Sequence, residues 1–157
     1  MLSGWRIAAP RHAKTPEEML SGEGAYLYGG RWNSKGTRLV YLGSSKAQSA
    51  MELLVHLDKS SVIGTYHSLQ VNFPDELVSH IDPDELPDNW SDASMASSVM
   101  AVGDSWVRDQ GSVILRVPSA AVMGETNYLF NPEHPDAGKI TVGEIELFDF
   151  DPRVVKS

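Results

Sequence analysis

Residues 39–58 read LVYLGSSKAQSAMELLVHLD and carry the clearest secondary-structure pattern of the chain. Leu39–Leu42 is a short apolar run ended by Gly43, which predicts a buried strand. A helix is predicted from Ser45 to Asp58, because Ser44 or Ser45 can cap its first turn and apolar residues then recur at helical spacing. The segment therefore predicts a strand that is followed directly by a helix.

The predicted helix has an unusually wide apolar face. At about 100° per residue its apolar arc covers roughly 200°, so we expect the helix to be packed on more than one side. The narrow polar stripe that remains includes Gln48, Ser49, Glu52 and His56. Glu52 is either an ordinary solvated glutamate or a carboxylate that lines a cleft, and His56 lies one turn further on as a candidate partner.

The rest of the chain predicts short elements of both kinds. The pattern favours strands at Trp5–Ala9, His67–Phe73, Val113–Val117 and Ile140–Phe150, helical segments at Pro16–Leu20 and Ala96–Asp109, and irregular segments at Gly22–Gly36, Asp82–Trp90 and Tyr128–His134. Strands and helices are interspersed without a regular βαβ rhythm. We therefore predict an α+β fold in a single domain over residues 1–157.

Composition excludes several classes of function. The net charge of −8 argues against direct nucleic-acid binding and against a basic membrane-surface helix. No apolar run approaches the ~20 residues of a membrane span, and no signal peptide is recognisable, so we expect a cytoplasmic protein. The chain has no cysteine, and its five histidines lack metal-ligand spacing, so no metal site is predicted.

The segment Gly29-Gly30-Arg31-Trp32-Asn33 is a candidate ligand-binding loop. Glycines let a backbone approach a ligand closely, and the planar fork of arginine suits phosphate. Nearby aromatic side chains could stack on a flat ring. The loop matches neither a P-loop nor a dinucleotide fingerprint. The residues alone leave open a plain surface loop whose arginine forms a salt bridge.

Several segments, in this order along the chain, resemble the RES-domain family, the toxin partners of Xre-like antitoxins. They are Gly29–Asn33, Val40-Tyr41, Ala50–Leu54, Gly103–Trp106, Val117–Ala120, Asn127–Pro135 and Phe148–Arg153. The positions that give the family its name are matched by Arg31, Glu52 and Ser119. The resemblance implies a fold similar to ADP-ribosyltransferases of the diphtheria-toxin type, with NAD as substrate and no separate cofactor.

The resemblance also implies roles for individual residues. Arg31 would bind the phosphates of NAD, and Tyr41 and Tyr28 would orient its nicotinamide ribose end. Glu52 would stabilise the cation that forms on the ribose, and Ser119 would position the substrate or hold Glu52. We expect Arg31, Tyr41 and Glu52 to be catalytic and Tyr28, Arg31 and Ser119 to bind substrate. Looser candidates for the pocket wall are Trp32 and Asn131.

The implied activity is NAD cleavage that leads to growth arrest, and the acceptor stays open. Water or phosphate would make the protein an NAD hydrolase or phosphorylase, which we favour. A protein side chain would make it an ADP-ribosyltransferase. A non-catalytic module that binds a nucleotide or a partner is the alternative of another class.

The implied partner is an Xre-like DNA-binding antitoxin that covers the active site. Operator binding would fall to the antitoxin, given the charge of this chain. The acidic residues of 82–92 are either a docking surface for it or an ordinary solvated loop. We also keep a homodimer among the expectations.

Overall fold

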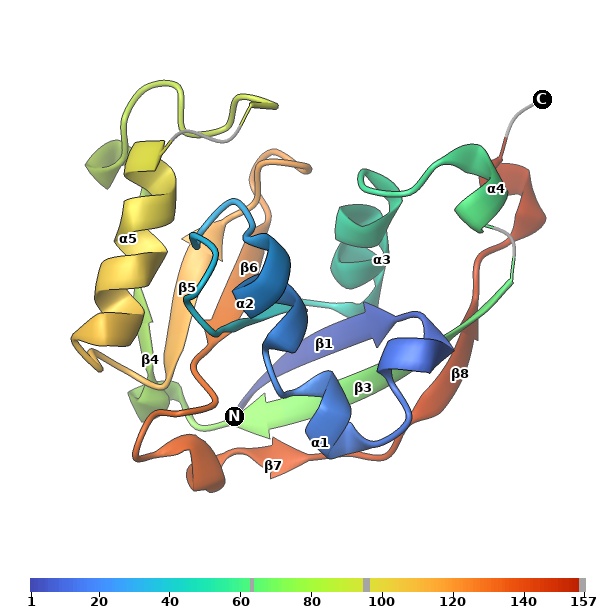
Figure 1. Ribbon diagram of the computed structural model, residues 1–157, viewed down its shortest axis with the longest axis horizontal. Coiled ribbons are helices and arrows are strands. Elements are labelled where there is room, and N and C mark those ends of the chain that lie inside the picture. Colours follow the sequence, from blue (N-terminus) through green and yellow to red (C-terminus); the bar gives the residue numbers. More distant parts are fainter. Residues whose placement is uncertain (63, 95–96, 156–157) are drawn as a thin grey trace.

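The computed structural model describes residues 1–62, 64–94 and 97–155 (Figure 1). The strands are β1 (Leu2–Ala8), β2 (Val40–Gly43), β3 (Thr65–Phe73), β4 (Val78–His80), β5 (Ile114–Pro118), β6 (Thr126–Phe130), β7 (Thr141–Val142) and β8 (Glu146–Asp149). The helices are α1 (Pro16–Met19), α2 (Glu23–Tyr28), α3 (Lys46–Leu54), α4 (Lys59–Val62) and α5 (Ser97–Arg108). Short 3₁₀ turns lie at Pro10–His12, Asp75–Leu77, Pro83–Glu85, Ala137–Lys139 and Pro152–Val154.

The strands form one eight-stranded sheet in the order β4-β5-β6-β2-β1-β3-β7, and β8 also pairs with β3. The β4–β5 pair is parallel, and the other pairs are antiparallel. In Figure 1, α5 lies at the β4–β5 end of the sheet and α3 lies beside β1. The α+β prediction is confirmed.

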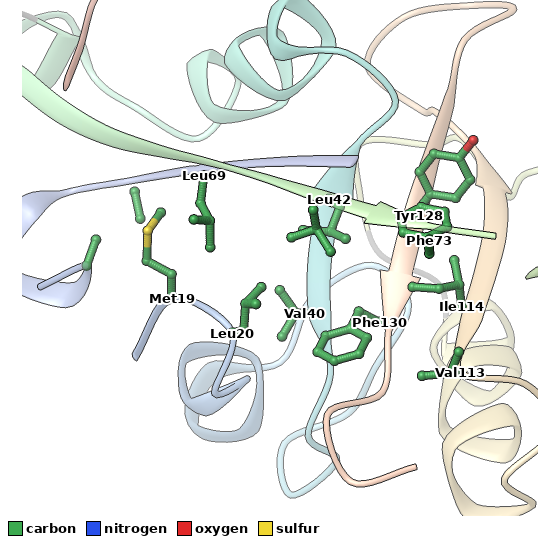
Figure 2. Close-up of a cluster of buried hydrophobic side chains, with 13 residues drawn as sticks. Met19, Leu20, Val40, Leu42, Leu69, Phe73, Val113, Ile114, Tyr128 and Phe130 are labelled. Carbon is green, nitrogen blue, oxygen red and sulfur yellow. The ribbon is translucent and has the colours of Figure 1, made fainter. Parts of the chain in front are cut away.

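One face of the sheet carries the larger core (Figure 2). Strand β3 alternates as predicted, with Leu69, Val71 and Phe73 fully buried on this face. Helix α1 supplies Met19, and the Thr15 hydroxyl accepts a hydrogen bond from the Glu18 N–H, as expected for its N-cap. The opposite face carries a second core, which α5 and the segment after α2 cover.

Helix α3 is shorter than predicted, and it turns its polar side, not its apolar side, toward the sheet. Gln48 and Ser49 are its buried residues, whereas Met51 and Val55 are 43% and 57% exposed. The expectation that its apolar arc would be packed on more than one side is therefore wrong. The reason is Gly43: a Cβ there would lie 2.5 Å from the backbone nitrogen of Ser49, so the polar side of the helix sits directly on β2.

Three other predictions were wrong in part. Segment 22–36 contains α2, because Gly22 and Gly29, both at φ 74°, bracket a helical turn. Segment 128–134 begins inside β6, which pairs with strands on both sides and is buried on both faces, so it shows no alternation. Segment 140–150 is divided into β7 and β8, and its Leu147 is 74% exposed on an outer strand. Ala96 of the second predicted helix lies outside the described residues.

Candidate active site

The Gly30–Asn33 turn is held by a buried asparagine. The backbone N–H of Gly30 donates to the carbonyl of Asn33 at 3.0 Å, and the Asn33 N–H donates back at 3.4 Å. The Asn33 amide is fully buried and donates to the carbonyl oxygens of Ala25, Ser34 and Thr37 at 2.9–3.1 Å. Because these contacts join α2 to the residues that lead into β2, the turn is preorganised.

Tyr41 supports the same turn from β2. Its hydroxyl donates to Oδ1 of Asn33 at 2.6 Å and accepts from the Trp32 N–H at 3.0 Å. A Cβ at Gly30 would come within 2.5 Å of the Tyr41 oxygen, so glycine is required there. Burial raises the pKa of Tyr41 well above its usual value, against the opposite effects of the Trp32 hydrogen bond and the Arg31 charge. Tyr41 is therefore a neutral phenol that fixes the turn.

Arg31 extends from this turn, and most of its donors are unused within the described part of the chain. Its Nη1 donates to the carbonyl oxygen of Trp90 at 2.8 Å. Among residues 1–62, 64–94 and 97–155, Arg31 forms no ion pair, so the structure does not support the salt-bridge alternative. A guanidinium has five N–H donors, and the rest of this fork is available to an anionic ligand.

Asp104 of α5 ties the end of the turn to the helix. Its carboxylate accepts from the Ser34 backbone N–H at 2.9 Å and from the Ser34 hydroxyl at 2.6 Å. Burial acts to raise the pKa of Asp104, but the hydrogen bonds from Ser34 and Thr37 and the charge of Arg108 outweigh it, so the pKa lies below the usual value. The charged form is thus the one that holds the loop.

Glu52 is oriented by a chain of side-chain amides. Asn127 Nδ2 donates to Glu52 Oε2 at 2.6 Å, and Asn127 Oδ1 accepts from Gln48 Nε2 at 3.0 Å. Gln48 and Asn127 are both buried, and Glu52 is partly exposed. The polar stripe of the helix therefore lines the interior beside the sheet, and Glu52 is more than a solvated surface residue. His56 is exposed and forms no hydrogen bond with Glu52.

The strand register places the residues that hold Arg31 and Glu52 on one face of the sheet. Tyr41 pairs with Leu129, and Asn127 lies between Gly43 on one side and Val117 on the other. Because cross-strand partners point to the same face, Tyr41 and Asn127 are diagonal neighbours, for which about 7–8 Å is typical. Arg31, held at the Tyr41 end, and Glu52, held by Asn127, therefore belong to the same side of the molecule.

A cavity of about 490 Å³ lies at the end of β5 and the start of β6. Its lining includes Val117 and Ser119 from the β5 end, Thr126 from β6, and Trp90 from the loop that Arg31 contacts. Arg31, Tyr41, Glu52 and Tyr28 are not among the lining residues. The cavity thus adjoins the Arg31–Glu52 region without containing either group.

The other residues that the sequence suggested for the site take no part in holding Arg31 or Glu52 through their side chains. Tyr28 is 76% exposed at the end of α2. Ser119 is buried, but its Oγ accepts from the Val122 N–H at 3.0 Å, so Asn127 and not Ser119 holds Glu52. Trp32 is a core residue, and Asn131 accepts from the Glu133 N–H beyond the far end of β6.

Four polar residues of this region lie in candidate segments of the sequence but were given no individual role there: Asn33, Gln48, Asp104 and Asn127. A weak signal existed for Asn127, because an asparagine directly before the apolar run Tyr128–Phe130 must find a hydrogen-bonding partner if the strand is buried. Nothing in the sequence says that this partner is a glutamate 75 residues earlier.

Two negative findings concern the described part of the chain alone. No three His, Asp or Glu side chains within it gather as metal ligands would. No helix within it has the length and apolar character needed to cross a membrane.

Comparison with known proteins adds to this geometry. The family model described as RES domain matches residues 3–151. The chain belongs to the RES domain family. This RES domain is 37% identical to a Sphingobium sp. protein named Prs ADP-ribosylating toxin, over 98% of this chain and 97% of the relative. It is 36% identical to the Yersinia enterocolitica protein named Toxin Res, over 85% and 89% of the two chains.

A solved structure shares the fold of this RES domain. It is the crystal structure of the M. tuberculosis MbcT–MbcA toxin–antitoxin complex. The match has a TM-score of 0.71 at 18% identity and covers 98% of this chain and 86% of the other. At that identity the likeness shows the fold.

Proposed function

We propose that this RES domain is a toxin that cleaves the bond between nicotinamide and ribose in NAD. The observation that carries the proposal is that Arg31 and Glu52 belong to one face of the sheet. Arg31 keeps most of its donors unused among the described residues, and Asn127 fixes the carboxylate of Glu52. The names of the curated relatives, which are toxins, support the toxic role.

The chemistry suits these two groups. Cleaving the bond builds an oxocarbenium-like cation on the ribose, and nicotinamide leaves as a neutral molecule, so no strong general acid is needed. Arg31 would bind the pyrophosphate through charge-assisted hydrogen bonds and so orient the dinucleotide. Glu52 would place a fixed negative charge beside the cation, and its Oε1 would accept a hydrogen bond from a ribose hydroxyl.

The proposal has two versions, which differ in the acceptor of the ADP-ribosyl group. Transfer to water or phosphate destroys free NAD and needs no surface for a macromolecular target, and this is our first candidate. Transfer to a protein side chain is the second candidate. It is favoured by the Sphingobium relative, whose name describes ADP-ribosylation and which aligns over almost its whole length.

Incubation of the purified protein with NAD tests the proposal. We expect free nicotinamide to accumulate, as measured by chromatography. Mass spectrometry of the other product, with and without phosphate and cell extract, separates ADP-ribose, ADP-ribose phosphate and a modified protein. If no nicotinamide is released in any of these mixtures, the enzymatic proposal is wrong and a non-catalytic binding module becomes the better account.

We further propose that the partner is an Xre-like antitoxin that covers this site. The support is the fold shared with a toxin from a solved toxin–antitoxin complex. Asp82 lines the cavity, and it and the exposed Asp84, Glu85 and Asp88, which follow it along the chain, offer negative charge to a basic partner. We expect toxin and antitoxin to co-elute on a sizing column at low salt, and separate elution would contradict this partner. A homodimer stays a prediction.

A further inference from the structure

We propose that the cavity beside Trp90 binds the adenosine half of the dinucleotide. The inference rests on the proposed function in taking NAD as the substrate. It assigns an occupant to the space that Trp90, Val117, Ser119 and Thr126 enclose.

The position of the cavity selects this half. The reacting ribose must touch Glu52, and Glu52 does not line the cavity. Val117, which does line it, pairs directly with Asn127, the residue that holds Glu52. Arg31 reaches from the Tyr41 turn to the carbonyl oxygen of Trp90 at the cavity wall. A dinucleotide with its pyrophosphate on Arg31 and its nicotinamide ribose on Glu52 therefore has its other nucleoside at this cavity.

The volume and the lining suit a nucleoside better than a phosphate. At about 490 Å³ the cavity falls within the ~300–1,000 Å³ that is usual for small-molecule sites. Apart from His80, its ionisable lining residues are Arg116 and the carboxylates of Asp82 and Glu125. This excess of negative charge disfavours a phosphate inside. Carboxylates and hydroxyls are good partners for ribose hydroxyls and for the exocyclic amine of adenine.

Trp90 is the side chain that we expect to stack on the adenine. Its ring packs against Trp32 with centroids 6.4 Å apart and planes tilted by 36°, so its orientation is restrained before any ligand binds. Its backbone carbonyl, not its ring, bonds Arg31. Replacing the ring therefore leaves the contact with Arg31 available.

Equilibrium binding of the two halves of NAD tests the proposal. AMP and nicotinamide mononucleotide each carry one nucleoside and one phosphate, and both can be measured by calorimetry. We expect Trp90→Ala to weaken AMP binding about tenfold or more, as for the loss of a stacking platform, and to change nicotinamide mononucleotide binding less than twofold. Trp90→Phe, which keeps an aromatic face, should recover most of the AMP affinity.

A second variant tests the cavity without removing Trp90. Ala120 lines the cavity, whereas its exposed neighbour Ala121 does not. We expect Ala120→Trp to fill the space and abolish AMP binding, while the matched control Ala121→Trp binds AMP as the parent does. Thermal unfolding of both variants checks that each one folds.

The outcomes separate this inference from the proposed function. If the parent fails to bind AMP, or if Trp90→Ala and Ala120→Trp bind it like the parent, the adenosine assignment is wrong even where nicotinamide is released. If these variants weaken nicotinamide mononucleotide instead, the cavity holds the other half of the substrate and the assignment is overturned. If AMP binds as expected but no NAD is cleaved, the proposed reaction fails and the nucleoside site stands.

Discussion

Glu52→Gln is expected to lower kcat for nicotinamide release from NAD by about 10²–10³-fold. Fixed electrostatic groups beside a developing charge contribute roughly 3–4 kcal/mol to transition-state stabilisation, which corresponds to that factor. Glutamine keeps the shape of the side chain, and its amide oxygen can still accept the hydrogen bond that Asn127 donates to Glu52. The change therefore removes charge without removing the contact that positions the residue.

The KM for NAD should change little, because the variant leaves Arg31 and the cavity intact. Initial rates of nicotinamide release at several NAD concentrations separate kcat from KM. Glu76→Gln is the matched control, since Glu76 is exposed in the turn after β3 and lies outside the site. If purified Glu52→Gln consumes NAD at the rate of the parent, the role assigned to this carboxylate is wrong.

Local pattern predicted the elements that depend on local interactions. The β2–α3 segment, the alternating strand β3 and the Thr15 cap of α1 each follow from neighbouring residues. The failures have a common cause. Strand β6 shows no alternation because a core on each face of the sheet buries its side chains, and the orientation of α3 depends on how closely the helix approaches Gly43. Both are tertiary effects that a single segment does not encode.

The candidate site, too, could be predicted from the sequence only in part. Arg31 and Glu52 were candidates from the sequence, but only the pairing of β2 with β6 brings them to one face. That pairing joins residues far apart along the chain, and a register shift by one residue would turn Asn127 to the other face. Of the two roles predicted for Ser119, holding Glu52 is taken by Asn127, and positioning the substrate stays a prediction. Arg31 and Glu52 could therefore be chosen as candidates from their residue types, whereas the hydrogen bonds that support them could not be predicted.

Gly103→Ala is expected to destabilise the fold by about 3 kcal/mol, although it lies within α5. In an open helix the same change stabilises by up to about 1 kcal/mol, because alanine has the better helix propensity. At Gly103 a Cβ would overlap the carbonyl oxygen of Trp32, which is a backbone atom and cannot turn aside. The helix or the Arg31 turn must move, and overpacking of this kind outweighs the gain in propensity.

Denaturant unfolding of Gly103→Ala and Gly24→Ala measures whether overpacking at Gly103 outweighs the gain in helix propensity. Gly24 lies within α2, has no positive φ, and a Cβ there would meet nothing within 4 Å. Gly24→Ala should therefore be neutral or slightly stabilising, while Gly103→Ala shifts the unfolding midpoint strongly downward. Because Trp32 follows Arg31 directly, the displaced turn should also weaken NAD binding in the folded fraction of Gly103→Ala. Equal stability of the two variants would show that α5 does not pack against the turn this closely, and the anchoring of Arg31 from this side would have to be abandoned.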